Sequence, residues 1–341
     1  MSSPSPEVSV ALPAFNAART LPAALDSLLA QTHPCFEIVV ADDGSTDATA
    51  EVLAAYAARD PRMRPLLLPH RGVAHAFNAA VAAARGALVA RMDADDRCLP
   101  RRLELQAAHL RAHPATGVVA CRVEFGGCRR TCAGYAAHVD WTNALLTHEA
   151  MSLARFVDAP LANPSVMFRR ELVAAHGGAR QGDFPEDYEM WLRWFDAGVR
   201  MDKLPQALLV WNDPPGRASR TDPRYALDAF YRVKARYLAR WLAAHNPHHP
   251  EVVVLGAGRV TRRRAVLLEE HGVRIAAWAD IDPRKIGNAV AGVPVVHRSE
   301  LPGPQGCFAL SYVASRGARE DIAAFLEARG FRPGVHYIVA A

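Results

Sequence analysis

Short apolar segments alternate with segments of helical periodicity through roughly the first third of this chain. The apolar segments cover residues 8–12, 36–41, 64–68 and 87–92, and each has the length and composition of a buried strand. The segments between them carry leucine, valine and alanine at helical spacing. Strands that alternate with helices predict an α/β fold, in which helical crossovers join the strands of a parallel sheet.

A polar segment divides the chain. Residues 245–250 read His-Asn-Pro-His-His-Pro, and their two prolines and lack of apolar side chains are typical of a linker. A second strand, helix and strand series follows, with strands expected at residues 251–255 and 273–279. A chain of 341 residues has room for two domains. We therefore expect a larger domain over residues 7–245 and a smaller α/β domain over 251–341.

Composition excludes several classes of protein. Half of the residues are hydrophobic and 22% are charged, which excludes global disorder. The net charge of +5 includes no long block of one sign, so we expect no nucleic-acid partner. The N-terminal segment lacks the pattern of a secretion signal, and no apolar segment approaches the roughly 20 residues that span a bilayer. We expect a cytoplasmic protein with at most peripheral contact at the inner membrane face, and six reduced cysteines.

Two acidic clusters each follow a predicted strand. Asp42 and Asp43 come directly after the second strand, and Asp93-Ala94-Asp95-Asp96 comes after the fourth. Ligands of open parallel sheets bind at the carboxyl ends of the strands, so both clusters are expected at one edge. The three carboxylates of the second cluster repel one another, and oxygen ligands at this spacing suit Mg²⁺ or Mn²⁺ that also contacts substrate phosphates. The alternative for each cluster is a solvated acidic loop that leads into a helix.

A third acidic cluster stands at the start of a helix predicted over residues 186–197. It contains Glu186, Asp187 and Glu189, and aromatic side chains follow within two turns. Attraction to the helix dipole explains acidic residues at this place without any catalytic role. A carboxylate beside aromatics at a helix start is also held in position and partly desolvated, as a general base must be.

These segments resemble the family 2 glycosyltransferases, inverting enzymes that use nucleotide-diphospho-sugars and have the GT-A fold. The similarity extends from residue 7 to about residue 225, and it is carried by residues 8–16, 28–32, 37–47, 70–86, 93–96, 163–169 and 186–193. It implies a domain with a mixed, mainly parallel sheet. It also implies transfer of a hexosyl or related sugar to an acceptor hydroxyl, in polysaccharide or glycoconjugate biosynthesis. The partners would be a nucleotide-diphospho-sugar donor and a saccharide or lipid-linked saccharide acceptor.

The resemblance also implies a role for individual residues. Asp187 would be the catalytic base, and Asp95 would bind Mg²⁺ or Mn²⁺ as part of a DXD motif. The donor nucleotide would be bound by Pro13, Asp42, Asp43 and Asp93.

The chain departs from the family pattern near residue 212. Many relatives place a histidine there, close to the diphosphate, whereas this chain has Trp-Asn-Asp, which makes Asp213 the candidate for the remaining metal contact. Arg220 and Arg224 follow in a loop and, with Glu186, would lie on the acceptor or diphosphate side. Arginines bind diphosphate by bidentate hydrogen bonds, and the alternative is that these are solvated loop charges.

The second block resembles a dinucleotide-binding fingerprint. Residues 252–261 contain a Gly-Ala-Gly turn after a strand, and Asp280 or Asp282 follows the next strand, where a ribose-binding acid would stand. Thr261 replaces the third glycine of the fingerprint. The block is similar to the small Rossmann-like domains appended to sugar-modifying enzymes. Two other functions remain open: an NAD(P)-dependent sugar oxidoreductase or sensor, and a sugar-nucleotide-binding protein without turnover.

Overall fold

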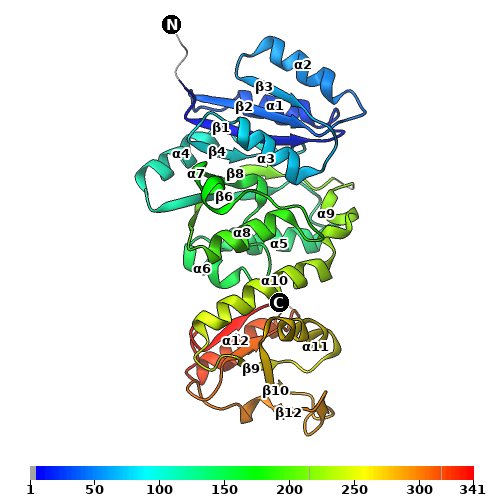
Figure 1. Cartoon of the computed structure of the whole chain (residues 1–341), viewed down its shortest axis with the longest axis vertical. Coiled ribbons are helices and arrows are strands. Elements are labelled where there is room, and N and C mark those ends of the chain that lie inside the picture. Colours follow the sequence, from blue (N-terminus) through cyan, green and yellow to red (C-terminus); the bar gives the residue numbers. More distant parts are fainter. Residues whose placement is uncertain (1–4, 215, 316) are drawn as a thin grey trace. The chain divides into compact units, whose positions relative to one another are not determined.

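A computed structural model describes residues 5–214, 216–315 and 317–341. Its contacts divide the chain into two compact units (Figure 1). The first unit contains the residues up to Met151 together with Pro160–Tyr225, and the second contains Ser152–Ala159 and Ala226–Ala341. Helix α10, Leu227–His245, is grouped with the second unit, whereas the sequence places it in the first domain. The domain boundaries at residues 245 and 251 remain a prediction.

Within the described residues, the first unit is built on an eight-stranded sheet in the order β3-β2-β1-β4-β7-β6-β8-β5. Its strands are β1 (Val8–Ala14), β2 (Phe36–Asp42), β3 (Met63–Leu67), β4 (Leu88–Arg91), β5 (Arg97–Cys98), β6 (Thr116–Phe125), β7 (Met167–Arg169) and β8 (Arg200–Trp211). Strands β3, β2, β1 and β4 are parallel. Strand β7 runs antiparallel between β4 and β6, and β5 is antiparallel to β8. The expected mixed, mainly parallel sheet is therefore confirmed.

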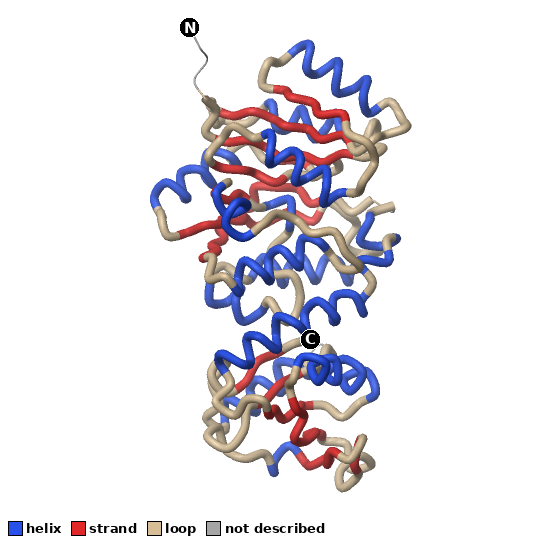
Figure 2. Tube along the Cα trace, viewed as in Figure 1, coloured by secondary structure: helices blue, strands red, loops and turns tan. Residues whose placement is uncertain are grey.

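Helices pack around this sheet, as Figure 2 shows. They are α1 (Leu21–Leu29), α2 (Thr49–Arg59), α3 (Val73–Ala83), α4 (Arg102–Ala112), α5 (Ala133–Ala144), α6 (His148–Ala154), α7 (Glu171–His176), α8 (Glu186–Asp196) and α9 (Ala218–Thr221), with 3₁₀ turns η1 (Asn163–Ser165) and η2 (Pro223–Tyr225). Strands β1 and β2 are buried along their whole length, because a parallel sheet covered on both faces has no solvent-facing side. The predicted strands and helices of the first 112 residues are found within a few residues of their expected bounds.

The two faces of β4 belong to two different hydrophobic cores. Leu88 and Ala90 pack into one core, and Val89 packs into the other. Successive side chains of a strand point to opposite faces, so the next residue, Arg91, points to the face of Val89. This is the face on which Phe77 of α3 and Met190 of α8 contribute to the core.

The second unit has its own sheet, in the order β11-β12-β10-β9-β13-β14. Its elements are β9 (Glu251–Leu255), α11 (Arg259–Ala265), η3 (Val266–His271), β10 (Arg274–Asp280), β11 (Ala289–Val290), β12 (Val293–His297), η4 (Arg298–Glu300), β13 (Ala309–Ser311), α12 (Ala318–Ala328) and β14 (Tyr337–Val339). The helix expected between the strands at 251–255 and 273–279 begins at Arg259 and ends as a 3₁₀ segment. Strands β12, β10, β9, β13 and β14 are parallel.

Helix α10 is packed into the second unit by its apolar face and by one buried amine. Lys234 is 2% exposed, and its Nζ donates to the carbonyl oxygens of Val157, at 3.2 Å, and Ala340, at 2.9 Å. Burial lowers the pKa of Lys234 to about 7. Within the described residues, no helix combines the length and hydrophobicity that crossing a bilayer would need.

Candidate functional site

The acidic loop, defined here as residues 93–96, begins at a strand end that a buried arginine stabilises. Arg102 of α4 has no exposed surface, and its Nη2 donates to the carbonyl oxygens of Arg91, at 2.7 Å, and Val166, at 3.2 Å. Its Nε donates to the side-chain oxygen of Gln106 at 3.1 Å. These bonds fix the end of β4, where the acidic loop begins.

Asn212, directly after β8, forms two hydrogen bonds with the acidic loop. Its main-chain N–H donates to Oδ1 of Asp96 at 2.8 Å, and its side-chain amide donates to the carbonyl oxygen of Asp95 at 2.7 Å. Because Asp213 is the next residue, this contact brings it to the acidic loop.

Two carboxyl groups of the acidic loop, those of Asp95 and Asp96, resist ionisation. Burial, and then the charge of Asp93, raise the pKa of Asp95 to about 6, against the opposing charges of Arg217 and Arg91. Burial, followed by the charges of Asp93 and Asp95, also raises the pKa of Asp96 well above its ordinary value. Within the described part of the chain, Oδ2 of Asp96 is buried and has no hydrogen-bond partner.

Asp213 is a second buried carboxylate beside this loop. Its side chain has no exposed surface and forms an ion pair with Arg220. Its Oδ1 is buried without a hydrogen-bond partner among the described residues. Carboxylate oxygens with unused lone pairs are the ligands that Mg²⁺ and Mn²⁺ prefer. No three His, Cys, Asp or Glu side chains in the described ranges form a group that could hold a metal ion, so a cation here would need ligands from a substrate.

Asp42, the last residue of β2, and Asp43 both accept hydrogen bonds from the protein's own backbone. Asp43 is 2% exposed, and its two carboxylate oxygens accept the main-chain N–H groups of Arg71, at 2.9 Å, and Gly72, at 2.8 Å. Asp42 accepts the main-chain N–H of Ser45 at 3.2 Å. Both residues therefore shape the loops at this sheet edge, and their contact with a nucleotide remains a prediction.

Pro13, near the end of β1, lies at the same edge and pairs with Ala41 of β2. Phe15, which follows shortly after it in the chain, forms an exposed aromatic pair with His70. Phe15 is 47% exposed and stacks on His70, with ring centroids 4.3 Å apart and an interplanar angle of 25°. The Nδ1 atom of His70 lies 2.9 Å from Oδ2 of Asp43. Phe15 was not among the site residues expected from the sequence, although an aromatic residue directly after a buried strand indicates a side chain at the edge of the sheet.

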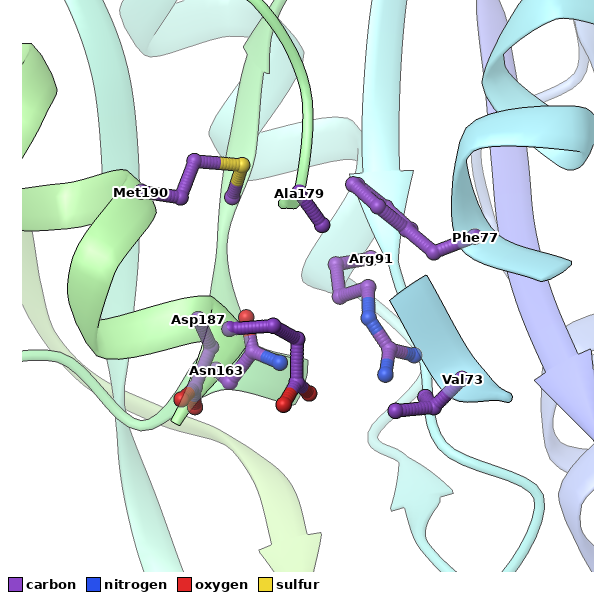
Figure 3. A pocket seen from close by; sticks show the side chains of 8 residues that line it. Val73, Phe77, Arg91, Asn163, Ala179, Asp187 and Met190 are labelled. Carbon is purple, nitrogen blue, oxygen red and sulfur yellow. The ribbon is translucent and has the colours of Figure 1, made fainter. Parts of the chain in front are cut away.

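The third cluster lies beside a pocket (Figure 3). The pocket is lined by Val73, Phe77, Arg91, Asn163, Ala179, Glu186, Asp187 and Met190. Burial, and then the charge of Glu186, raise the pKa of Asp187 to about 7, while the N–H of Tyr188 and the charge of Arg91 oppose that rise. Arg91 is 3% exposed, and its Nη2 lies 2.6 Å from Oδ1 of Asp93.

Tyr135 of α5 shows that the second and third clusters lie close together. Burial raises the pKa of its hydroxyl, and the charges of Asp213, Asp96 and Asp187 act in the same direction, against Arg217. The guanidinium carbon of Arg217 lies 4.7 Å from the ring centroid of Tyr135. The structure thus gathers residues from three different segments around one tyrosine.

Arg224 lies at the edge that Asp43 shapes. A Cβ atom placed on Gly72 would lie 3.9 Å from Nη1 of Arg224. The guanidinium of Arg224 is bound to Asp222, with Nη2 2.6 Å from Oδ2. Arg220 is likewise paired with Asp213. Neither arginine is a freely solvated loop charge.

In the second unit, Asp280, one of the two acids expected to bind a ribose, already accepts hydrogen bonds from the protein. Oδ2 of Asp280 accepts the N–H of Ala257 at 2.7 Å and lies 3.1 Å from Nζ of Lys285. Its Oδ1 accepts the N–H groups of Ile281, at 2.8 Å, and Asp282, at 2.9 Å. These bonds tie β10 to the turn after β9.

Comparisons with known proteins identify the family and the fold. The model of glycosyl transferase family 2 matches residues 9–177. EpsE of Bacillus subtilis (strain 168) is 29% identical over 234 residues, which cover 65% of this chain and 79% of EpsE. The amylovoran biosynthesis glycosyltransferase AmsE of Erwinia amylovora is 30% identical over 192 residues, covering 54% of this chain and 67% of AmsE. The crystal structure of S. aureus TarS 1-349 in complex with UDP-GlcNAc shares the fold, with a TM-score of 0.54, 20% identity, and coverage of 77% of this chain and 71% of the chain in that structure.

Proposed function

The chain belongs to glycosyl transferase family 2, and we propose that it transfers a sugar from a nucleotide-diphospho-sugar to an acceptor hydroxyl with inversion at the anomeric carbon. Its first unit has the GT-A fold. The observation that carries the proposal is the position of Asp187, a carboxylate with a raised pKa that lines a pocket opposite Arg91 and near the acidic loop.

In the proposed reaction, Asp187 is the general base. An acceptor hydroxyl in the pocket gives its proton to the carboxylate as its oxygen attacks the anomeric carbon, on the face opposite the leaving nucleoside diphosphate. A pKa of about 7 suits this role, because a base works best when its pKa lies near the working pH. Such a base contributes about 10²–10⁴ in rate, and the single displacement needs no covalent intermediate on the enzyme.

Asp95 and Asp213 are the residues that would hold Mg²⁺ or Mn²⁺. The buried oxygen atoms of Asp96 and Asp213 that lack hydrogen-bond partners fit a cation at this place, and the donor's diphosphate would complete its ligands. When bound, the cation would offset the negative charge that develops on the leaving diphosphate. Binding of Asp213 to the cation would release Arg220 from its ion pair, and Arg220 could then bind a diphosphate oxygen.

The donor nucleotide would lie at the edge that Pro13, Asp42 and Asp43 shape, with Asp93 on the ribose side. The exposed ring of Phe15 provides a flat surface for a base. TarS has this fold and binds UDP-GlcNAc, which supports a nucleotide-sugar donor. AmsE takes part in amylovoran biosynthesis, which supports a saccharide or lipid-linked saccharide as the acceptor and polysaccharide biosynthesis as the role.

For the second unit we propose a Rossmann-like domain that supports the enzyme without binding a dinucleotide. The parallel order β12-β10-β9-β13-β14 is that of a doubly wound sheet. A bound dinucleotide needs a carboxylate for its ribose hydroxyls, and both oxygens of Asp280 already accept hydrogen bonds from the protein. The oxygens of Asp282, the other candidate, accept hydrogen bonds from the guanidinium of Arg284. This favours the transferase over the NAD(P)-dependent alternative.

The experiment that tests the proposed function is a panel of nucleotide-sugars with Mg²⁺ or Mn²⁺, scored by thermal shift and by slow hydrolysis without an acceptor. One donor should raise the unfolding temperature and be hydrolysed. Asp187→Asn should keep the shift and lose the hydrolysis, which would separate the transferase from a binding protein without turnover. A shift with NADH or NADPH and none with any nucleotide-sugar would overturn the proposal.

A further inference from the structure

We infer that Arg91 is a positioning residue for the transfer, which holds Asp93 on the donor side of the site and keeps the base Asp187 ionised by facing it across the pocket. The inference rests on the proposed function, because it assigns Arg91 to the same site. The position of the residue, its ion pair and the charges around Asp187 each support it.

The backbone fixes Arg91 firmly at the end of β4. Its N–H donates to the carbonyl oxygen of Val166 at 2.9 Å, and its own carbonyl accepts from Nη2 of Arg102 at 2.7 Å. The strand directs its side chain to the face of Val89, where the guanidinium carbon lies 5.3 Å from the ring centroid of Phe77. The side chain is accordingly buried, with 3% of its residue surface exposed.

The guanidinium of Arg91 binds two neighbouring residues and also lines the pocket. Nη2 forms the ion pair with Asp93, and Nη1 donates to the carbonyl oxygen of Met92. The same group lines the pocket that contains Glu186 and Asp187 (Figure 3). An apolar side chain would fill this space at a lower cost in free energy, because burial of a charge is unfavourable. The buried guanidinium therefore indicates that the charge itself has a role.

The charged groups that face Asp187 come from three elements. Glu186 precedes it on α8, and the hydroxyl of Tyr225 in η2 is bound to Glu186. Arg91 ends β4, and Asp93 follows it in the acidic loop. Burial and the charges of Glu186 and Asp93 raise the pKa of Asp187, whereas Arg91 lowers it. Arg91 is the cation among these groups, so its removal leaves the charges of Glu186 and Asp93 without this opposing charge and favours the protonated form of Asp187, which cannot act as a base.

The test is the pH dependence of Asp187 in Arg91→Gln. Carboxyl ¹³C NMR of aspartate-labelled protein gives the titration midpoint of Asp187, with Asp187→Asn to assign the resonance. We expect the midpoint to rise by about one pH unit, which lowers the ionised fraction about tenfold below the midpoint. Transfer should fall by that factor at pH 6 and recover at pH 9. Arg91→Lys should stay close to the unmodified protein, because it keeps the charge.

Two further variants keep the test decisive if Arg91→Gln folds poorly. Asp93→Asn removes a negative charge near Asp187 and frees Arg91 from its partner, so the midpoint should fall. Arg101→Gln is the matched control, since Arg101 is an exposed arginine paired with Glu104, and its loss should leave the midpoint unchanged. An unchanged midpoint in both Arg91→Gln and Asp93→Asn, or a loss of transfer of the same size at every pH, would overturn the inference.

The NMR measurement needs no substrate, so it separates this inference from the proposed function. If the midpoint shifts as expected and no donor is turned over, the transferase proposal fails while the coupling between Arg91 and Asp187 stands. If transfer is observed and the midpoint does not move, the inference about Arg91 fails on its own.

Discussion

The hydroxyl of Tyr225 lies 2.8 and 2.7 Å from the two carboxylate oxygens of Glu186, the residue directly before the proposed base. These hydrogen bonds hold the carboxylate of Glu186 in place beside Asp187. The charge of Glu186 is, after burial, the largest cause of the raised pKa of Asp187.

Glu186→Gln should therefore shift the activity profile to lower pH. Glutamine keeps an oxygen for the hydroxyl of Tyr225 and removes the charge, so Asp187 loses its proton more easily. The acid limb of kcat against pH should move down by about half a unit to one unit, in the direction opposite to Arg91→Gln. Tyr225→Phe is the control for the hydrogen bond alone and should lower the free energy of unfolding by about 1–3 kcal/mol. An acid limb that stays in place in Glu186→Gln would show that Glu186 does not act on the base.

Asp187→Asn should lose transfer and gain stability. The pKa of Asp187 is higher in the folded protein than in the unfolded chain, so the folded state binds more protons between about pH 4 and pH 7, and the group's contribution to stability is lost as pH rises through 7. Asparagine removes this cost. We expect a rise of about 1–3 kcal/mol in the free energy of unfolding at pH 8, and little change at pH 4. Urea unfolding at both pH values checks this, and a loss of stability at pH 8 would contradict it.

Removal of divalent cations should weaken donor binding through Asp95. Calorimetric titration of UDP or GDP should show tighter binding with Mn²⁺ than with EDTA, and Asp95→Asn should abolish most of this difference. Arg220→Gln should strengthen the binding of Mn²⁺ alone, because Asp213 then has no ion-pair partner to exchange. Equal nucleotide binding and turnover of the unmodified protein with and without EDTA would remove the metal from the proposal.

Phe15→Ala should weaken the binding of a nucleotide without weakening the fold. Stacking of a base on an aromatic side chain contributes about 1–3 kcal/mol, so the dissociation constant should rise by at least fivefold. Leu67→Ala is the matched control, because Leu67 is also an exposed large apolar residue and is not part of the site. Equal affinities for Phe15→Ala and Leu67→Ala would place the base elsewhere.

Arg102→Met should lower the free energy of unfolding by about 2–4 kcal/mol, because several buried hydrogen-bond acceptors lose their donor. The neighbouring Arg101→Gln should change it by less than about 0.5 kcal/mol, since Arg101 lies at the surface. Denaturant unfolding of the two variants, side by side, tests whether the acidic loop depends on this support. Equal stabilities would show that it does not.

The parts of the fold that sequence predicted are those that local patterns determine. Strands β1, β2 and β4 are continuous apolar segments, and the helices between them have clear periodicity. Strand β7 has three residues and lies between β4 and β6 through pairings with distant segments, so no local pattern indicated it.

The candidate site divides in the same way. Its carboxylates cluster in the sequence, so they could be found there. Arg91 ends an apolar strand and Arg102 stands beside the exposed Arg101, and only the packing of several elements shows that Arg91 and Arg102 are buried. Tyr225 lies 39 positions from Glu186, and nothing in the intervening sequence indicates that they meet.

The anchoring of Lys234 determines how the protein should be divided for experiments. A chain cut at the prolines near residue 250 would keep α10 and lose the carbonyl oxygen of Ala340, leaving a buried amine with one of its two acceptors. The aromatic side chains of α10 would also lose their contacts with Phe308 and Tyr312. A fragment that ends at Tyr225 would avoid both losses. For recombinant expression, the useful cut site therefore lies about one helix upstream of the obvious one.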